Sequence, residues 1–153
     1  ASCGVRRTDE LAAAHGSDRS GAHHAPRPKE IDVDPRQIVN LYYAAWQQRA
    51  GDMTGVPLAD DFTFTGPVAS FTDAAGYTAM AKQAGAAVRS FRVRHQFVDG
   101  DLVCSVIDWE MDLLPGVLTA AEILEVRAGK IVRGQLIYDA EALRRALSTT
   151  ESG

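Results

Sequence analysis

The stretch FRVRHQFVDGDLVCSVIDWEMDLL, residues 91–114, decides the fold class that the sequence predicts. Apolar residues alternate with arginines in its first third, which is typical of a strand with one buried face. Asp99 and Gly100 form a two-residue hairpin sequence, and residues 102–114 continue as a second, longer strand. The stretch therefore predicts an antiparallel hairpin whose two faces differ in polarity.

More strand sequence follows this hairpin. The run LLPGV, residues 113–117, is typical of a turn, and residues 119–138 indicate two strands joined at Ala-Gly-Lys. In the segment DAEALRRAL, Asp139 is placed to cap a short closing helix. Four antiparallel strands and a terminal helix are therefore expected from residue 91 onward.

Two helices and one strand are predicted before residue 91. Asp34 and Pro35 suit the cap and the first position of a helix, and a short strand is expected at residues 61–65. Thr72 or Asp73 caps the second helix. The expected apolar stripe of the first helix is Ile38, Leu41, Tyr42, Ala45 and Trp46, and that of the second is Tyr77, Met80, Ala81, Ala84 and Val88.

This order of elements predicts an α+β fold, in which a strongly bent antiparallel sheet wraps around the N-terminal helices. The result would be a cone-shaped α+β barrel with an apolar pocket. The folded domain is expected to span residues 34–147. Residues 1–33 show no sustained periodicity and are expected to be a disordered tail, as are residues 148–153 at the other end.

The composition argues against several classes of function. With 153 residues, 46% of them hydrophobic, the chain can bury one core. The net charge is −4, and no block of Lys or Arg indicates a nucleic-acid partner. No apolar run reaches the roughly 20 residues that an integral membrane segment needs. The histidines of the N-terminal tail have no geometry to enforce coordination, so neither a metal site nor a cofactor is expected.

Cys3 and Cys104 are not expected to form a disulfide, because one lies in the tail and the other in a strand. Two lone thiols suit a reducing compartment, and the cytoplasm is the expected location. The start ASCG also resembles the end of a bacterial lipoprotein signal. An apolar segment upstream of it would instead make the protein lipid-anchored or secreted through Cys3.

Strand parity predicts which side chains face the pocket. On the long strand, the inward row is Val103, Ser105, Ile107, Trp109 and Met111, and the solvated row is Asp108, Glu110 and Asp112. On the next strand, Glu122 interrupts an apolar row. An unpaired buried carboxylate costs several kcal/mol, so Glu122 is expected to be a protonated donor in the cavity or to pair with an arginine across the sheet.

His95 shares a strand face with Phe91, Val93 and Phe97 by the same parity. A lone histidine on an apolar strand face is usually a core residue, and this interpretation is favoured. If the face opens into the cavity, His95 becomes the candidate general base, since imidazole titrates near neutral pH.

Three segments resemble the nuclear transport factor 2-like superfamily, namely YYAAWQQRAGD, ADDFTFTGPV and RAGKIVRGQLIYD. The resemblance covers residues 34–147. The superfamily includes ketosteroid isomerases, SnoaL-like polyketide cyclases and limonene-type epoxide hydrolases. It implies a homodimer of cone-shaped domains, each with a deep apolar pocket for an apolar small molecule.

The ketosteroid isomerase pattern implies two catalytic positions. The tyrosine that donates to the substrate oxygen falls on Tyr42, and the protonated acid beside it falls on Glu122, where those isomerases have Asp. The resemblance and the strand parity together predict these ligand-binding positions: Trp46, Phe62, Phe64, Tyr77, Ser105, Trp109, Met111, Gly134 and Tyr138.

The proton-shuttling base of those isomerases falls on Gly66, in TGPV. A glycine cannot remove a proton, so the chemistry is expected at Glu122, as in SnoaL-like cyclases, whose acid/base carboxylate lies in the later strands. The Asp-Arg-Asp constellation of limonene-type hydrolases cannot be assembled on the inward faces.

Two kinds of function stay open. The first is a cofactor-independent cyclase, isomerase or hydratase for a polycyclic, polyketide or terpenoid-like substrate, with Glu122, Tyr42 and His95 as its catalytic candidates. The alternative is a non-catalytic binding protein for an apolar small molecule, or a dimeric scaffold domain.

Overall fold

The computed structural model describes residues 33–151, which confirm the α+β class. The helices are α1 (Pro35–Gln48), α2 (Ala74–Gly85) and α3 (Glu141–Thr150). The strands are β1 (Leu58–Thr65), β2 (Ser70–Phe71), β3 (Val88–Asp99), β4 (Leu102–Met111), β5 (Leu114–Arg127) and β6 (Lys130–Ile137). Residues 1–32 of the expected tail lie outside the described residues.

The strands form one sheet in the order β2-β1-β6-β5-β4-β3. Strands β3 to β6 are antiparallel, as predicted. The expected antiparallel sheet has one exception, because β1 runs parallel to β6. The meander β3 to β6 leaves the edge of β6 free, and β1, which precedes α2 and the meander in the chain, pairs with that edge. The sheet is unclosed, since β2 and β3 are its two edges among the described residues.

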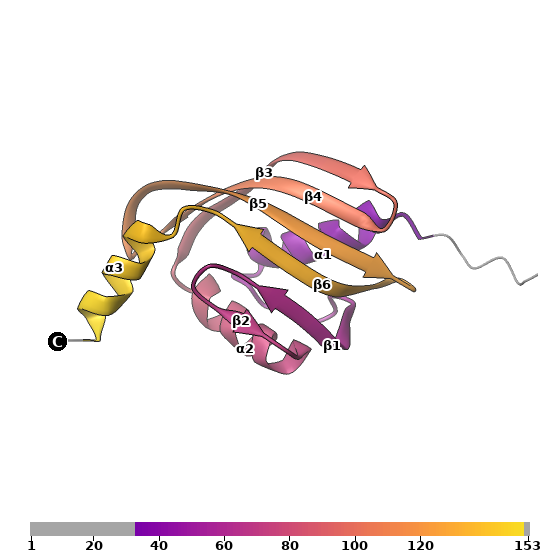
Figure 1. The fold of residues 1–153 in the computed structure, drawn as a ribbon, viewed down its shortest axis with the longest axis horizontal. Coiled ribbons are helices and arrows are strands. Elements are labelled where there is room, and N and C mark those ends of the chain that lie inside the picture. Colours follow the sequence, from indigo (N-terminus) through magenta and orange to yellow (C-terminus); the bar gives the residue numbers. More distant parts are fainter. Residues whose placement is uncertain (1–32, 152–153) are drawn as a thin grey trace, which may run out of the picture. The chain divides into compact units, whose positions relative to one another are not determined.

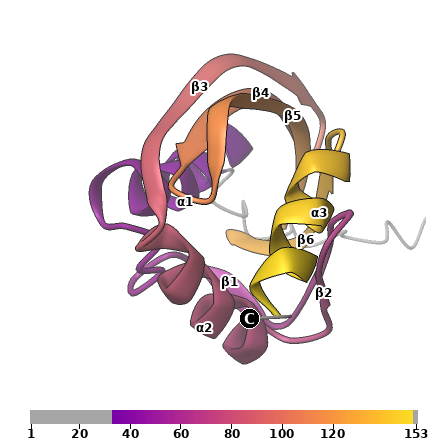
Figure 2. The same cartoon turned by 90° about the vertical axis from the view of Figure 1, so that its left-hand side faces the viewer.

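The sheet curls strongly around α1. Figure 1 shows β3 to β6 arching over this helix, and Figure 2 shows α2 lying across the open side, next to β1. Helix α1 contacts the inner face of all four of these strands. This arrangement is the cone that the sequence predicts, and it leaves the space between α1, α2 and the inner face of the sheet for a cavity.

Helix α1 begins where the sequence predicts it. The Asp34 side chain accepts a hydrogen bond from the Arg36 backbone N–H at 2.9 Å, which stabilises the first turn. The predicted apolar stripe is partly wrong, because Leu41 is 49% exposed whereas Val39 and Tyr43 are buried. A curled sheet surrounds more of the helix than a flat one would, so the buried face of α1 is broader and rotated toward Val39 and Tyr43.

Helix α2 starts at the second predicted cap. The Asp73 side chain accepts from the Gly76 N–H at 2.7 Å. The far end of α2 packs directly on the loop after α1, where a Cβ on Gly85 would lie 1.9 Å from the Ala50 carbonyl oxygen. A glycine is therefore needed for this close approach of two backbones.

Two predicted boundaries near the C-terminus are wrong. The turn expected at residues 113–117 is earlier, so that β5 already begins at Leu114. A register shift opposite Trp109 and Met111 accommodates the extra residues within β5. Helix α3 continues to Thr150, three residues beyond the expected domain end. Its N-cap is Ala140 and not the predicted Asp139, although the Asp139 side chain, one residue earlier, accepts from the Glu141 N–H at 3.0 Å.

Candidate functional site

A cavity of about 160 Å³ lies among α1, α2 and the inner face of the sheet. Residues 66–69 after β1 and Leu143 of α3 contribute to its rim. Of the positions predicted from the sequence, the following line it: Tyr42, Trp46, Phe64, Tyr77, Trp109, Met111, Glu122 and Tyr138. Among residues 33–151, Glu122 is the one Asp, Glu, Lys, Arg or His that belongs to this lining.

Aromatic rings form most of the walls of this cavity. The indole of Trp46 stacks on the ring of Phe91, with centroids 5.9 Å apart. The indole of Trp109 meets Tyr138 edge-on at 5.1 Å. Such walls favour a ligand with a flat or bulky apolar body.

The polar end of the cavity is a chain of three side chains from three elements. Tyr42 of α1 lies within 3.0 Å of Glu122 Oε2 on β5 and donates its hydroxyl hydrogen to it. The hydroxyl of Tyr42 also makes a short hydrogen bond with that of Tyr77 on α2. Glu122 is only 3% exposed, and it makes no ion pair with the described residues. The chain therefore joins a carboxyl to two phenols in an otherwise apolar space.

The protonation of these groups follows from their burial. Burial raises the pKa of the Glu122 carboxyl to about 7, against the lowering effect of the Tyr43 and Tyr42 hydroxyls. Burial, with the nearby Glu122 charge, also raises the pKa of Tyr42 and that of Tyr77 above the usual phenol value. At neutral pH both phenols are neutral donors, while the carboxyl is divided between its acid and its base form.

A second group of polar atoms lies behind Glu122. The Tyr43 hydroxyl, Ser105 Oγ and Glu122 Oε1 are buried and make no hydrogen bond of standard geometry with the described residues. Ser105 is directly opposite Glu122 in the register of β4 and β5. The sequence reasoning did not identify Tyr43, although the dipeptide Tyr42-Tyr43 on a helix with a broad buried face was a usable signal.

Three predicted ligand-binding residues lie behind the cavity wall. Phe62, Ser105 and Gly134 are buried but are not part of the cavity lining. Phe62 packs edge-on against Tyr77 at 5.1 Å, and a Cβ on Gly134 would lie 3.0 Å from the ring of Phe64. These residues therefore support the residues that line the cavity.

His95 is exposed, and it is not part of the cavity lining. The predicted alternation of faces fails at His95 because the register of β3 shifts after Val93. Val93 pairs with the inward Ile107 of β4, whereas His95 pairs with Val106. One extra residue moves every later side chain to the opposite face. Gln96 consequently turns inward, where it donates to the Asn40 side chain of α1 at 3.0 Å.

Gly66 lies at the rim of the cavity. A Cβ on Gly66 would lie 3.1 Å from the Phe64 ring and 3.2 Å from the Ala69 carbonyl oxygen. The Gly66 N–H donates to that same carbonyl at 2.9 Å. A side chain at this position would therefore have to displace its neighbours.

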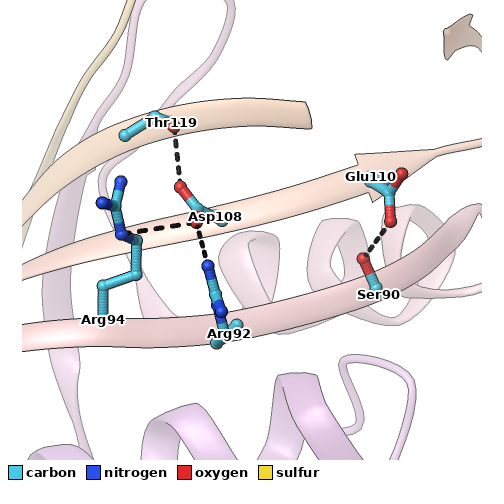
Figure 3. A network of polar contacts seen from close by, with 6 residues as sticks. All are labelled: Ser90, Arg92, Arg94, Asp108, Glu110 and Thr119. Atoms are coloured by element: carbon cyan, nitrogen blue, oxygen red, sulfur yellow. Dashed lines mark hydrogen bonds and ion pairs between the residues drawn. The ribbon is translucent and has the colours of Figure 1, made fainter. Parts of the chain in front are cut away.

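The carboxylates of the outer face pair with the arginines. Asp108 was expected to be solvated, but its side chain is only 12% exposed, with Arg92 at 2.9 Å and Arg94 at 3.6 Å. Thr119 donates to its other oxygen at 2.7 Å, as Figure 3 shows. These contacts, led by the Thr119 hydroxyl, hold the pKa of Asp108 below its usual value. None of the ion pairs among the described residues joins an arginine to Glu122.

Among residues 33–151, no three His, Cys, Asp or Glu side chains gather closely enough to hold a metal ion. Within the same range, no helix combines the length and the apolar character that crossing a membrane requires.

Solved structures with the same fold come from several bacteria. An NTF2-like protein of unknown function from Cytophaga hutchinsonii is 20% identical, with a TM-score of 0.64 over 73% of this chain and 96% of that one. A protein from Catenulispora acidiphila with a ketosteroid isomerase-like fold, solved with trimethylamine, is 20% identical, with a TM-score of 0.58 over 72% and 92%. A LEH-like epoxide hydrolase from M. tuberculosis is 16% identical, with a TM-score of 0.58 over 77% and 95%.

The curled sheet around α1 and the cavity beside it thus define an α+β protein of the NTF2-like superfamily. No curated protein sequence matches the chain. The SnoaL-like domain family matches residues 39–134, and the chain belongs to this family.

Proposed function

We propose that this protein is a cofactor-independent enzyme of the SnoaL-like type that acts on an apolar small molecule carrying a carbonyl or a similar oxygen group. The observation that carries the proposal is the hydrogen bond from Tyr42 to Glu122 at the wall of the apolar cavity. The substrate class would be polycyclic, polyketide or terpenoid-like, and the reaction a cyclisation, an isomerisation or a hydration.

Glu122 would supply the acid/base chemistry. Its pKa of about 7 keeps both protonation states populated at neutral pH, which is the condition for efficient proton transfer. The carboxylate would take a proton from the carbon next to a carbonyl, leaving an enolate and a protonated Glu122. The acid would then return this proton to another carbon or to the oxygen. A hydroxyl of the Tyr42–Tyr77 pair would stabilise the enolate oxygen.

The test is turnover of a panel of polycyclic ketones, linear polyketones and terpene epoxides. Glu122→Gln keeps the shape of the side chain but cannot accept a proton, so turnover should be lost while ligand binding stays nearly intact. Tyr138→Phe is the matched control, because Tyr138 lines the same cavity and makes no hydrogen bond to Glu122. Full activity in Glu122→Gln would overturn the proposal.

The alternative is a binding protein that uses the same cavity without chemistry. The stacked and edge-on aromatic pairs of the walls favour it, because they bind an apolar body without any proton transfer. Under this alternative, Trp109→Ala lowers the affinity for a ligand whose binding is measured by quenching of tryptophan fluorescence. The wild-type protein forms no product with any member of the panel. We assign His95 no role in either function, because it is exposed and does not belong to the cavity lining.

We also propose a homodimer, which the family resemblance implies. The outer face of the sheet offers exposed apolar side chains, with Phe97 62% exposed on β3 and Ile137 50% exposed on β6. An apolar sheet face is a suitable surface for a second copy of the chain. Phe97→Glu should convert a dimer into a monomer in light scattering, and a monomeric wild type would contradict the proposal.

A further inference from the structure

The two oxygens of the Glu122 carboxyl have different surroundings. Oε2 accepts from Tyr42, which belongs to the chain that reaches Tyr77 and lines the cavity. Oε1 is buried and belongs to the group of three polar atoms without a hydrogen bond of standard geometry, together with the Tyr43 hydroxyl and Ser105 Oγ. Neither Tyr43 nor Ser105 belongs to the cavity lining. The carboxyl therefore has one side toward the ligand space and one side toward the protein interior.

The three interior atoms come from different elements that meet at this point. Tyr43 follows Tyr42 on α1, and the two rings pack edge-on at 5.3 Å. Ser105 and Glu122 are paired residues of neighbouring strands, so their side chains emerge side by side on the inner face. Buried polar atoms are nearly always paired in native proteins, and an unpaired group is destabilising. The Tyr43 hydroxyl is close enough to both Ser105 and Glu122 to interact with each of them.

The donors and acceptors of this group match best when Glu122 is ionised, because a hydrogen bond to a charged oxygen is stronger than one to a neutral oxygen. Tyr43 and Ser105 each bring one O–H, and an ionised Oε1 brings an acceptor. Tyr43 can then donate to Oε1 while Ser105 donates to the Tyr43 oxygen, which satisfies all three atoms. A proton on Oε1 turns this oxygen into a donor and a weaker acceptor, so the hydrogen bond from Tyr43 loses its charge-assisted strength. Hydrogen bonds to a charged form favour that form, so the interior pair opposes the effect of burial.

The electrostatic effects agree with this geometry. Burial and the Glu122 charge raise the pKa of Tyr43, whereas the Ser105 hydroxyl lowers it. The titratable side chains that face Glu122 are Tyr42 and Tyr43 of α1 and Tyr77 of α2. Beyond these, Tyr138 belongs to the cavity lining, and the neighbours of Glu122 in the sheet, Ser105 and Leu136, do not ionise. Tyr43 is therefore the principal interior group that can favour ionised Glu122.

We propose that Tyr43, supported by Ser105, is a positioning residue that hydrogen bonds the interior oxygen of Glu122 and favours the ionised carboxyl. Tyr42 and Tyr43 then hold the two oxygens of one carboxyl from consecutive positions of one helix. The inference deepens the proposed function, because it names the groups that keep Glu122 available as a base. Its functional meaning rests on that proposed function. Its test, however, needs no substrate.

The experiment is a carbon-13 NMR titration of glutamate side-chain carboxyls in the full chain, in which the Glu122 signal is the one lost in Glu122→Gln. Wild-type Glu122 should titrate near pH 7. Tyr43→Phe should raise this midpoint by about one pH unit, since one strong hydrogen bond to the charged form is removed. Ser105→Ala should raise it by about half as much, and Tyr138→Phe should leave it unchanged.

An unchanged or lowered midpoint in Tyr43→Phe would overturn the inference. If the amide spectrum shows that Tyr43→Phe does not fold, the titration of Ser105→Ala becomes the test. An unchanged Glu122 midpoint in Ser105→Ala would then overturn the inference. A purely structural role would change the thermal midpoint of unfolding without moving the titration of Glu122. A raised Glu122 midpoint combined with full activity of Glu122→Gln would reject the proposed function and leave this inference standing.

Discussion

Tyr42 and Glu122 are 80 positions apart in the sequence, yet the phenol of the first lies 3.0 Å from the carboxyl of the second. The bond joins α1 to β5 and makes the helix part of the cavity wall. It also links stability to the candidate chemistry, because the carboxyl that it holds is buried and titrates near neutral pH. Several properties that can be measured depend on this relationship and on the packing around it.

The stability of the protein should fall between about pH 4.5 and pH 7 because of Glu122. Its folded pKa of about 7 lies above the usual value of 4.5, so the folded state binds the proton more tightly than the unfolded state. The contribution is complete below the unfolded pKa and is lost as the pH rises through the folded one. The loss should reach about 3 kcal/mol, given 1.36 kcal/mol per pKa unit.

Glu122→Gln is the variant that isolates this effect, because its amide does not titrate. Urea unfolding from pH 4.5 to pH 8 should show similar stability of the two proteins at acid pH and a more stable variant above pH 7. Stability curves that stay parallel over this range would show that Glu122 does not carry a raised pKa.

Asp108 should show the opposite dependence on pH. Thr119 and Arg92 hold its pKa below the usual value, so it stabilises the fold above the unfolded carboxyl pKa, and this contribution is lost as the pH falls. Asp108→Asn should therefore lower the urea midpoint at pH 7 and leave it unchanged at the acid end. Glu110→Gln is the control, because Glu110 bonds Ser90 at an exposed position. Equal effects of the two substitutions at pH 7 would contradict the expectation.

Tyr42→Phe should destabilise the protein by about 1–3 kcal/mol, the usual cost of leaving buried polar partners unpaired. The substitution leaves both Glu122 Oε2 and the Tyr77 hydroxyl without the partner that they share. Urea unfolding at pH 7 measures the effect. The matching substitution Tyr138→Phe removes a half-buried hydroxyl and should change stability by less than about 0.5 kcal/mol. A Tyr42→Phe protein as stable as wild type would show that the hydrogen-bond chain contributes nothing.

Gly85→Ala should destabilise the fold by about 3 kcal/mol, because the added carbon would lie 1.9 Å from the Ala50 carbonyl oxygen and two backbones would have to separate. Gly76→Ala lies in the same helix, where the nearest contact is a movable Asp73 side chain at 3.2 Å. This control should change stability by about 1 kcal/mol or less. The order of the two thermal midpoints checks the prediction, and the reverse order would refute the packing of α2 on this loop.

Local patterns account for the elements that the sequence predicted correctly. Asp34 and Asp73 cap their helices as expected, since a cap depends on the few residues around it. The inward row of β4 is also correct, because alternation holds wherever a strand is regular. The differences between prediction and structure include Leu41, His95 and the direction of β1 relative to β6. Each of these depends on packing between distant segments.

The spacing of apolar residues along helices and strands is enough to predict an α+β protein and an inward-pointing Glu122. The surroundings of that carboxyl depend instead on how the elements pack together. The rotation of α1 in the curled sheet brings Tyr42 and Tyr43 to it, and the shift in β3 moves His95 away from the cavity. The rotation of a helix and the register of a strand depend on contacts between segments that are far apart in the chain. The periodicity within one segment therefore does not predict them.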